Sequence, residues 1–226
     1  MFERLIQLIG EEKLEKLKKS TVLIFGLGGV GGSATEAIAR SAFGTIILVD
    51  KDTVELSNIN RQLVALHSTI NHTKTEVLKK RILDINPACN VITYNMFYNF
   101  ETKDQIWQNK IDYVIDCIDT ITFKIDIAKV CQDKGIPHIS VMGTGNKYHP
   151  EKLEIMPLSK TEYDPIAKVM RKKLRIDYKL NEIIVVASKE IPEKTDSTTQ
   201  SPSSNAFVPN TAGIIAASYI FNKAIE

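Results

Sequence analysis

The sequence predicts an α/β fold: a doubly wound, Rossmann-like, mostly parallel sheet with flanking helices and a C-terminal extension. Short apolar runs alternate with segments of helical apolar spacing along the first 142 residues, as strands and crossover helices do. The first apolar run leads into the glycine-rich stretch GLGGVG at 26–31, which a helix-like segment follows. The second run ends in an acid, Asp50, nineteen residues after Gly31. Together these three observations are typical of a nucleotide-binding sheet.

The central elements follow in chain order from these patterns. TVLIF and TIILV are continuous apolar runs, as expected of strands that are buried on both faces of a parallel sheet. The segment TEVLKKRILDI has apolar residues at helical spacing and is stopped by Asn86 and Pro87. We therefore expect strands at 21–25, 45–49, 91–97, 111–117 and 138–142, and helices at 33–43, 75–85 and 123–134.

The two ends of the chain have different patterns. Residues 1–20 mix charged and apolar residues, which predicts an amphipathic helix and excludes a secretory signal. The C-terminal part, 143–226, contains two further strand-like runs on either side of a basic helix, followed by a polar, Ser/Thr-rich stretch that predicts a mobile loop. These elements are expected at 153–156 and 183–187 (strands), 168–179 (basic helix), 193–205 (loop) and 211–224 (C-terminal helix). The whole chain, 1–226, is expected to form a single domain.

Composition limits the classes of protein to consider. A chain of 226 residues with 43% hydrophobic content can bury a full core. No run approaches the roughly 18 apolar residues of a membrane span, so no membrane partner is expected. The three cysteines are widely spaced and odd in number, which excludes a disulfide framework or a CxxC zinc site and favours the cytoplasm.

The distribution of charge along the chain says more about binding partners than the net charge does. A net charge of +2 does not by itself indicate a nucleic-acid partner. Residues 168–179, KVMRKKLRIDYK, hold six basic residues and one acid. Such a segment is either a solvated helix face or a patch that contacts phosphates, and the sequence leaves both open.

The glycine-rich turn predicts a nucleotide site. Glycines between a strand and a helix let the backbone approach a phosphate, and the helix N-terminus attracts its charge. This interpretation makes candidates of Gly26, Gly28, Gly29 and Gly31, with Asp50 on the ribose. The motif alone does not choose between NAD and ATP, and tight packing of the helix against the strand would also explain the glycines.

Three charged residues favour ATP over NAD as the bound nucleotide. Arg61 lies in SNINRQ (57–62) beyond the second strand, Lys74 precedes a helix, and Asp119 follows the fourth strand. All three are expected at the carboxyl edge of the sheet, where open α/β sheets bind ligands. Two cations and a carboxylate suit ATP with Mg²⁺, because the cations neutralise phosphate oxygens and the carboxylate holds the metal. A redox pyrophosphate needs less charge.

The same residues carry a resemblance to a known superfamily. GLGGVG, VDKDTVELSNINRQ, HTKTEVLKKRILDINP and VIDCIDT, in this order, resemble the adenylating domain of the ubiquitin-activating-like (ThiF-type) superfamily over about the first 145 residues. The resemblance implies the roles of the candidate residues. The backbone around Gly28 and Gly29 would face the ATP phosphates, Asp50 the ribose, Asn58, Arg61 and Lys74 the phosphate oxygens, and Asp119 Mg²⁺, while Arg4 would reach the partner's ATP site in a homodimer.

The later part of the chain resembles a narrower family. SVMGTGNKYHPEKLEI, LSKTEYDPIAKVMRKKLR and SPSSNAFVPNTAGIIAASYIF are similar to segments of the tRNA threonylcarbamoyladenosine dehydratases. This implies ATP-dependent cyclisation of N6-threonylcarbamoyladenosine in tRNA through an acyl adenylate on the threonyl carboxylate. The resemblance also implies a tRNA surface on the basic helix, a monovalent cation (Na⁺ or K⁺) near 143–150, and a sulfur-relay protein as a candidate partner.

The cysteines bear on which acid is activated. No cysteine follows Cys131, and both Cys117 and Cys131 fall in buried patterns, so packing is their expected role and no thioester step within the chain is expected. The main competing hypothesis is an adenylyltransferase that activates the C-terminal glycine of a sulfur-carrier or small-modifier protein. A non-catalytic Rossmann module and a dehydrogenase are weaker hypotheses, since neither needs the two cations and the carboxylate together.

Overall fold

The computed structural model describes residues 1–193 and 202–226. It contains one seven-stranded sheet with the strand order β3-β2-β1-β4-β5-β7-β6. Every strand pairs in parallel with its neighbour except β6, which is antiparallel to β7 at the edge. The strands are β1 Thr21–Phe25, β2 Thr45–Val49, β3 Asn90–Tyr94, β4 Tyr113–Asp116, β5 His138–Val141, β6 Leu153–Pro157 and β7 Ile184–Ser188.

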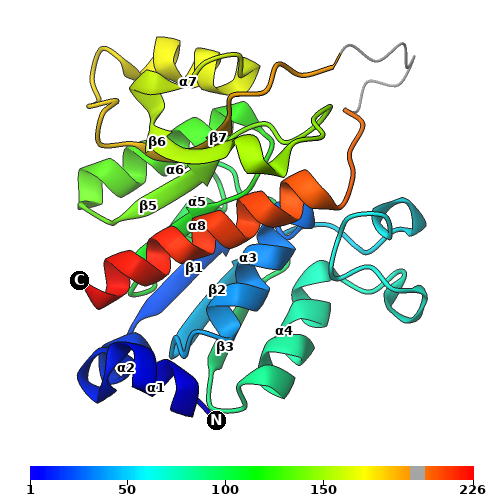
Figure 1. The fold of residues 1–226 in the computed structure, drawn as a ribbon, viewed down its shortest axis with the longest axis vertical. Helices are drawn as coiled ribbons and strands as arrows, with labels where there is room; N and C mark the ends of the chain where they lie inside the picture. Colours follow the sequence, from blue (N-terminus) through cyan, green and yellow to red (C-terminus); the bar gives the residue numbers. More distant parts are fainter. Residues whose placement is uncertain (194–201) are drawn as a thin grey trace.

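Helices cover both faces of this sheet (Figure 1). They are α1 Glu3–Ile9, α2 Glu11–Lys18, α3 Gly29–Ala39, α4 Lys74–Ile85, α5 Lys103–Trp107, α6 Ile121–Lys134, α7 Pro165–Leu174 and α8 Phe207–Ile225. Short 3₁₀ turns occur at η1 Leu56–Asn58, η2 His67–Thr69, η3 Pro150–Lys152 and η4 Leu158–Lys160. Among the described helices, none is both long and apolar enough to cross a membrane.

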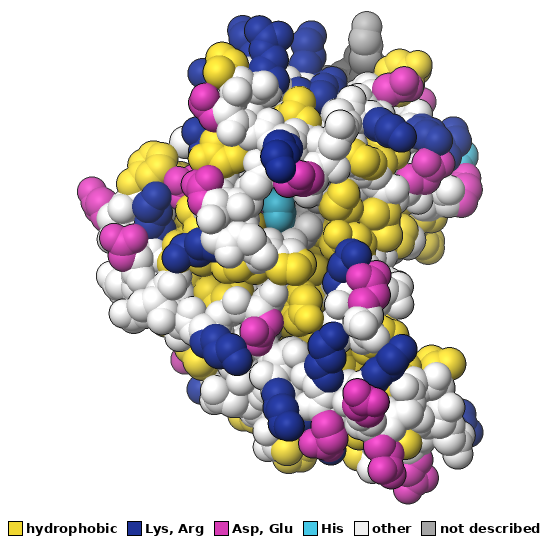
Figure 2. Space-filling model, turned by 90° about the vertical axis from the view of Figure 1, so that its left-hand side faces the viewer, with side chains coloured by type: hydrophobic (Ala, Val, Ile, Leu, Met, Phe, Trp, Pro, Cys, Tyr) yellow, Lys and Arg dark blue, Asp and Glu magenta, His cyan; other side chains and the backbone are white. Residues whose placement is uncertain are grey.

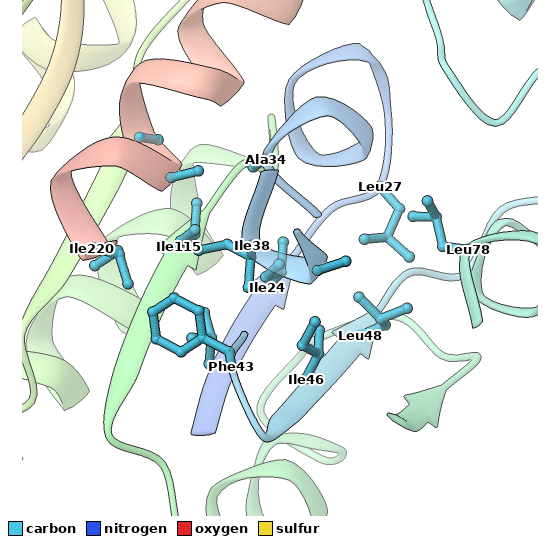
Figure 3. Packing of buried hydrophobic residues seen from close by; sticks show 14 of the residues in the cluster. Ile24, Leu27, Ala34, Ile38, Phe43, Ile46, Leu48, Leu78, Ile115 and Ile220 are labelled. Carbon is cyan, nitrogen blue, oxygen red and sulfur yellow. The ribbon is translucent and has the colours of Figure 1, made fainter. Parts of the chain in front are cut away.

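The alternation of side chains along β1 explains the two layers. Val22 and Ile24 join the cluster beneath α3, α4 and α8, whereas Leu23 and Phe25 join the cluster beneath α5 and α6. Figure 3 shows the first cluster, in which Ile24 and Ile38 lie between the sheet and the helices. All of β1 is buried, which is why its sequence is a continuous apolar run.

The strand order creates the crevice that holds the site. β1 lies between β2 and β4. The chain continues from β1 to β2 and β3 on one side of β1 and then crosses to β4 on its other side. Phe25 is in register with Val49 of β2 and with Asp116 of β4, so the three strands end at the same level. Their outgoing loops therefore meet at one edge, the usual ligand position in open α/β sheets.

Most expected elements are confirmed. The strands at 21–25 and 45–49 have the expected bounds, and the remaining expected strands and central helices are present with shifted ends. The largest shift in the central part is in the helix expected at 33–43, which begins at Gly29 inside the glycine motif. The strands of the C-terminal part join the main sheet, because β7 pairs with β5.

Three details differ from expectation, and one expected element falls mostly on residues that the structure does not describe. The N-terminal helix is two helices, separated at Gly10, whose φ of 84° a helix does not accommodate. The basic helix is α7 Pro165–Leu174 rather than 168–179, because Asp164 caps its N-terminus and accepts a hydrogen bond from Ala167 N. Helix α5 was not expected. Of the loop expected at 193–205, residues 194–201 lie outside the described residues.

Candidate functional site

A cleft of about 360 Å³ lies at the carboxyl ends of β1, β2 and β4. Loops that are far apart in the sequence form its walls. They supply, in chain order, Gly26, Gly28, Val49 to Thr53, Glu55, Asn58, Arg61, Gln62, Lys74, Met96 to Tyr98 and Cys117 to Thr120. Seven of the ten candidate residues are therefore brought together: Gly26, Gly28, Asp50, Asn58, Arg61, Lys74 and Asp119.

The glycines of the turn divide into two groups. Gly26 and Gly28 line the cleft, and Gly26 has a φ of 78°, which favours glycine. Gly29 and Gly31 do not line the cleft. A Cβ at Gly31 would lie 1.7 Å from the carbonyl oxygen of Gly26, so this glycine is needed where the helix approaches the turn. Gly29 begins α3 and lies against the Arg61 carbonyl and Pro209.

Asp50 joins the first two loops of the cleft. Its Oδ2 accepts a hydrogen bond from Leu27 N at 2.6 Å, and its Oδ1 accepts one from Asp52 N at 2.8 Å. The two bonds fix the carboxylate next to the glycine turn. Each carboxylate oxygen can accept a further bond, so the arrangement allows Asp50 to receive a ribose hydroxyl.

The SNINRQ stretch begins in the 3₁₀ turn η1 and continues as a turn that orients Arg61. Asn58 is buried, and its Oδ1 accepts a hydrogen bond from Glu55 N at 3.2 Å. Arg61 Nη1 donates to the Ser57 carbonyl at 2.9 Å and to Asn60 Oδ1 at 2.8 Å. The guanidinium is thus held by its own turn at the wall of the cleft.

Gln62 is a lining residue that sequence reasoning missed. It is only 8% exposed, and its Oε1 has no hydrogen-bond partner within the described part of the chain. A buried amide oxygen without a partner is costly, so a ligand or water in the cleft is expected to satisfy it. No local pattern distinguishes this glutamine from an exposed one.

Lys74 lies at the first position of α4, after Thr73, whose side chain caps the helix. The Lys74 side chain is 6% exposed, and its Nζ lies 3.0 Å from Asp52 Oδ2. Asp52 was also missed, although it lies in the VDKD motif two residues after Asp50. The pair keeps the ammonium inside the cleft wall, where a phosphate can compete with the half-exposed Asp52 for it.

Asp119 is exposed and lines the cleft from the loop after β4, two residues after Cys117. Its Oδ1 accepts a long hydrogen bond of 3.4 Å from the Thr120 hydroxyl. Within the described ranges, no group of three or more His, Cys, Asp or Glu could hold a metal by itself. A single carboxylate fits Mg²⁺ in a nucleotide site, because substrate phosphates and water complete its octahedral shell.

Arg4 is not brought to this cleft. It is exposed on α1, which Figure 1 shows at the end of the sheet away from the loops that follow β1, β2 and β4. The residue lines no part of the cleft of its own chain.

The thiols are placed in apolar surroundings. Burial raises the pKa of Cys117 and that of Cys131 well above the usual range, and raises the pKa of Cys89 to about 11. Cys117 lies in the wall of the cleft, but a thiol with a raised pKa remains protonated at neutral pH and is a weak nucleophile.

The 143–150 loop is held by a cation of the protein itself. Lys147 Nζ donates to the Gly143 carbonyl at 2.6 Å and lies 3.8 Å from Asp164 Oδ2. Both side chains are 1% exposed, and burial lowers the pKa of Lys147 while Asp164 and Glu190 oppose this shift. Glu190 accepts hydrogen bonds from the backbone N–H groups of Tyr148 and His149.

Known proteins are similar to this chain in sequence and in fold. The sequence matches the ThiF family over residues 2–219. It is 47% identical over 227 aligned residues to a tRNA threonylcarbamoyladenosine dehydratase of Bacillus subtilis (strain 168), with 94% of this chain and 89% of that protein covered.

Solved structures give the same result. The tRNA N6-threonylcarbamoyladenosine dehydratase TcdA of Escherichia coli in complex with ATP superimposes with a TM-score of 0.91 at 31% identity, over 99% of this chain and 93% of that one. The complex of the same enzyme with AMP gives a TM-score of 0.90 at 32% identity, over 97% and 92% of the two chains.

Proposed function

The chain belongs to the ThiF family and, within it, to the tRNA threonylcarbamoyladenosine dehydratases, and we propose that it cyclises N6-threonylcarbamoyladenosine in tRNA with ATP. The observation that carries the proposal is the convergence of Arg61, Lys74 and Asp119 on one cleft beside the glycine turn. In this proposal the whole chain acts as one adenylating domain.

The reaction has two steps. An oxygen of the threonyl carboxylate attacks the α-phosphorus of ATP, which forms the acyl adenylate and releases pyrophosphate. The neighbouring carbamoyl nitrogen or oxygen then attacks the acyl carbon, closes a ring and expels AMP, with the net loss of one water. The first step is needed because AMP leaves far more readily than a carboxylate oxygen.

The protein contributes position and charge. Arg61 and Lys74 neutralise phosphate oxygens, Asp50 holds the ribose, and the glycine turn with the N-terminus of α3 lies against the phosphates. Asp119 would hold Mg²⁺, and the ion supplies neutralisation of the charge that the pyrophosphate gains. These roles are supported by the shared cleft and by the similarity to an enzyme solved with ATP.

A catalytic cysteine is not part of the proposal. The raised pKa values of Cys117 and Cys131 keep these thiols protonated. A tethered nucleophile also makes a thioester unnecessary, because well-oriented intramolecular attack reaches effective molarities of about 10⁵ M or more.

A monovalent cation in the 143–150 loop remains a prediction that the contacts do not favour. The Gly143 carbonyl, which such an ion could use, already accepts a hydrogen bond from the buried Lys147 ammonium. No step of the proposed reaction involves this ion.

We propose that the enzyme acts as a homodimer in which Arg4 reaches the cleft of the partner. The support is that Arg4 is exposed and lies away from the cleft of its own chain. A sulfur-relay partner and a cytoplasmic location rest on the sequence interpretation alone.

The basic helix α7 is the proposed tRNA surface. Lys168, Lys172, Lys173 and Arg175 are exposed in and just after α7, and none forms an ion pair within the described ranges. Figure 2 shows Lys and Arg side chains gathered at the end of the molecule where Figure 1 places α7. Cations without carboxylate partners remain available to phosphates.

Reversing two of these charges tests the surface. The double variant Lys172→Glu and Lys173→Glu is expected to raise the KM for tRNA about 10-fold or more and to leave ATP binding unchanged. The slope of log affinity against log salt should fall by about 1 for each lost phosphate contact. Lys79→Glu with Lys80→Glu on α4 is the matched control, and an equal effect of both pairs would contradict a specific surface.

The decisive test of the function is mass spectrometry of the digested tRNA. Purified protein with ATP and Mg²⁺ is expected to remove one water from threonylcarbamoyladenosine in tRNA and to release AMP stoichiometrically. Unmodified tRNA is the control and should give no AMP. If the nucleoside mass stays unchanged while ATP binds, and ATP–pyrophosphate exchange instead requires a protein with a C-terminal glycine, activation of that protein replaces the proposed activity.

A further inference from the structure

A fully buried polar cluster lies beneath the loop that carries Asp119. Its members are Asp116 at the end of β4, Ser140 on β5 and Lys124 on α6, and each is 0% exposed. Asp116 and Ser140 are direct neighbours in the parallel pairing of β4 with β5. None of the three lines the cleft, so the proposed chemistry does not use them directly.

One carboxylate organises the cluster. Lys124 Nζ lies 2.8 Å from Asp116 Oδ2, and the Ser140 hydroxyl donates to the same oxygen at 2.7 Å. The other oxygen, Oδ1, accepts a hydrogen bond of 3.1 Å from the backbone N–H of Ile118. Lys124 Nζ also lies 3.5 Å from the Asp116 carbonyl.

These contacts fix both ends of one short loop. Ile118 N–H anchors the loop just after β4, and Lys124 anchors the first turn of α6, which begins at Ile121. Ile118 and the two residues that follow it, Asp119 and Thr120, all line the cleft. Among the described residues, the Asp119 side chain has only the long hydrogen bond from Thr120, so its placement depends on the backbone that carries it.

Stability is a weak explanation for such a cluster. A buried ion pair must recover the desolvation of both charges, and well-packed apolar side chains in its place are often as stable or more so. The hydrogen bond from Ile118 N–H to the Asp116 carboxylate does, in contrast, fix the geometry of the loop that lines the cleft.

The cluster is also unsuited to proton transfer. Lys124 and Asp116 have no exposed surface, so neither can reach a substrate. The nearby His138 is buried, its pKa is lowered to about 4 mainly by burial, and it therefore stays neutral.

We propose that Asp116, Lys124 and Ser140 are positioning residues that hold the 117–120 loop so that Asp119 can bind Mg²⁺ together with ATP. The inference rests on the proposed function, because that function gives Asp119 its metal role. Residues that orient a metal ligand typically change metal affinity or activity 10- to 100-fold when they are replaced.

Two variants test the cluster in different ways. Ser140→Ala removes one hydrogen bond and keeps the ion pair. The double variant Asp116→Asn with Lys124→Met removes both buried charges but leaves an amide oxygen that can accept from Ile118 N–H. Calorimetric ATP binding with and without Mg²⁺, together with thermal melting, gives readouts that do not depend on tRNA.

The expected result is that Mg²⁺ strengthens ATP binding less in the variants than in the wild-type protein. Ser140→Ala should need about 10-fold more Mg²⁺ for half-maximal ATP binding, while ATP binding without Mg²⁺ stays unchanged. The double variant should fold and retain more of the Mg²⁺ effect than Lys124→Met alone. Lys103→Met is the matched control. It removes the ion-pair partner of Asp126, which lies on α6 as Lys124 does, and it should leave the Mg²⁺ dependence of ATP binding unchanged.

Two results would overturn the inference. One is a folded Ser140→Ala protein and a folded double variant that both keep wild-type Mg²⁺ dependence. The other is an absence of any Mg²⁺ effect on ATP binding in the wild-type protein. Failure of the proposed function has a different signature, since the wild-type protein would then bind ATP with Mg²⁺ but leave the modified nucleoside unchanged.

Discussion

Asp119→Ala is expected to lower AMP formation by at least about 10²-fold, because it removes the carboxylate that would hold the metal against the ATP phosphates. The melting temperature should stay near that of the wild type, since the side chain is exposed and, within residues 1–193 and 202–226, forms only a 3.4 Å hydrogen bond with Thr120. The measurement is the single-turnover release of AMP from ATP with modified tRNA, at several Mg²⁺ concentrations.

Two controls separate the metal role from other effects. Asp119→Asn keeps the shape of the side chain and removes its charge, so it should lose almost as much activity as the alanine variant. Asp84→Ala replaces another exposed aspartate, on α4 and outside the cleft, and should turn over normally. Unchanged turnover of Asp119→Ala would remove the metal role from this residue.

Arg61→Ala is expected to have the second large effect, about 10²- to 10³-fold on the rate of adenylation, because a preorganised cation next to the phosphates is lost. The guanidinium is already oriented through Nη1 by the Ser57 carbonyl and Asn60 Oδ1, so the wild-type enzyme need not order it when ATP binds. Pyrophosphate release with saturating ATP and modified tRNA is the measurement.

Replacement by lysine sharpens this second test. Arg61→Lys keeps the charge but not the planar fork, so it should recover only a small part of the lost rate. Arg40→Ala is a suitable control, since Arg40 pairs with Glu36 on the surface of α3 and lies outside the cleft. If Arg61→Ala binds and turns over ATP as the wild type does, the cation beyond β2 has no phosphate role.

Part of the site could be predicted because the residues lie next to strands and helices that the sequence pattern identifies. Arg61, Lys74 and Asp119 each follow or precede a strand or helix that its own apolar pattern identifies. Because parallel strands end at one edge, these three residues could be expected to meet there, and the cleft contains all of them.

The missed residues have no such local marker. Gln62 resembles any ordinary polar residue until the fold leaves its amide oxygen buried without a partner among the described residues. Lys124 falls in a helical segment where a lysine is usually solvated, yet it is 0% exposed and pairs with Asp116 at the end of strand β4. Gly31 is a phosphate-contact candidate by its motif, whereas in the structure it permits the close approach of α3 to Gly26.

Arg4 shows a different limit. The sequence places it in a helix but does not say which end of the sheet that helix covers. Gly10 breaks the expected helix into α1 and α2, and α1 lies away from the cleft of the same chain. An intermolecular role for Arg4 therefore depends on how two chains assemble.

The sequence by itself determined the α/β class, the order of the strands along the chain, the glycine turn, and the acid and cations on which the prediction of an ATP site rests. These are local properties, set by apolar periodicity and by the residue types that follow each strand. Only the tertiary structure decided which side chains are buried, which glycines serve packing, and how Asp116, Lys124 and Ser140 support the Asp119 loop. Such relations depend on contacts between segments distant in sequence, and burial determines whether a charge is solvated or must find a partner.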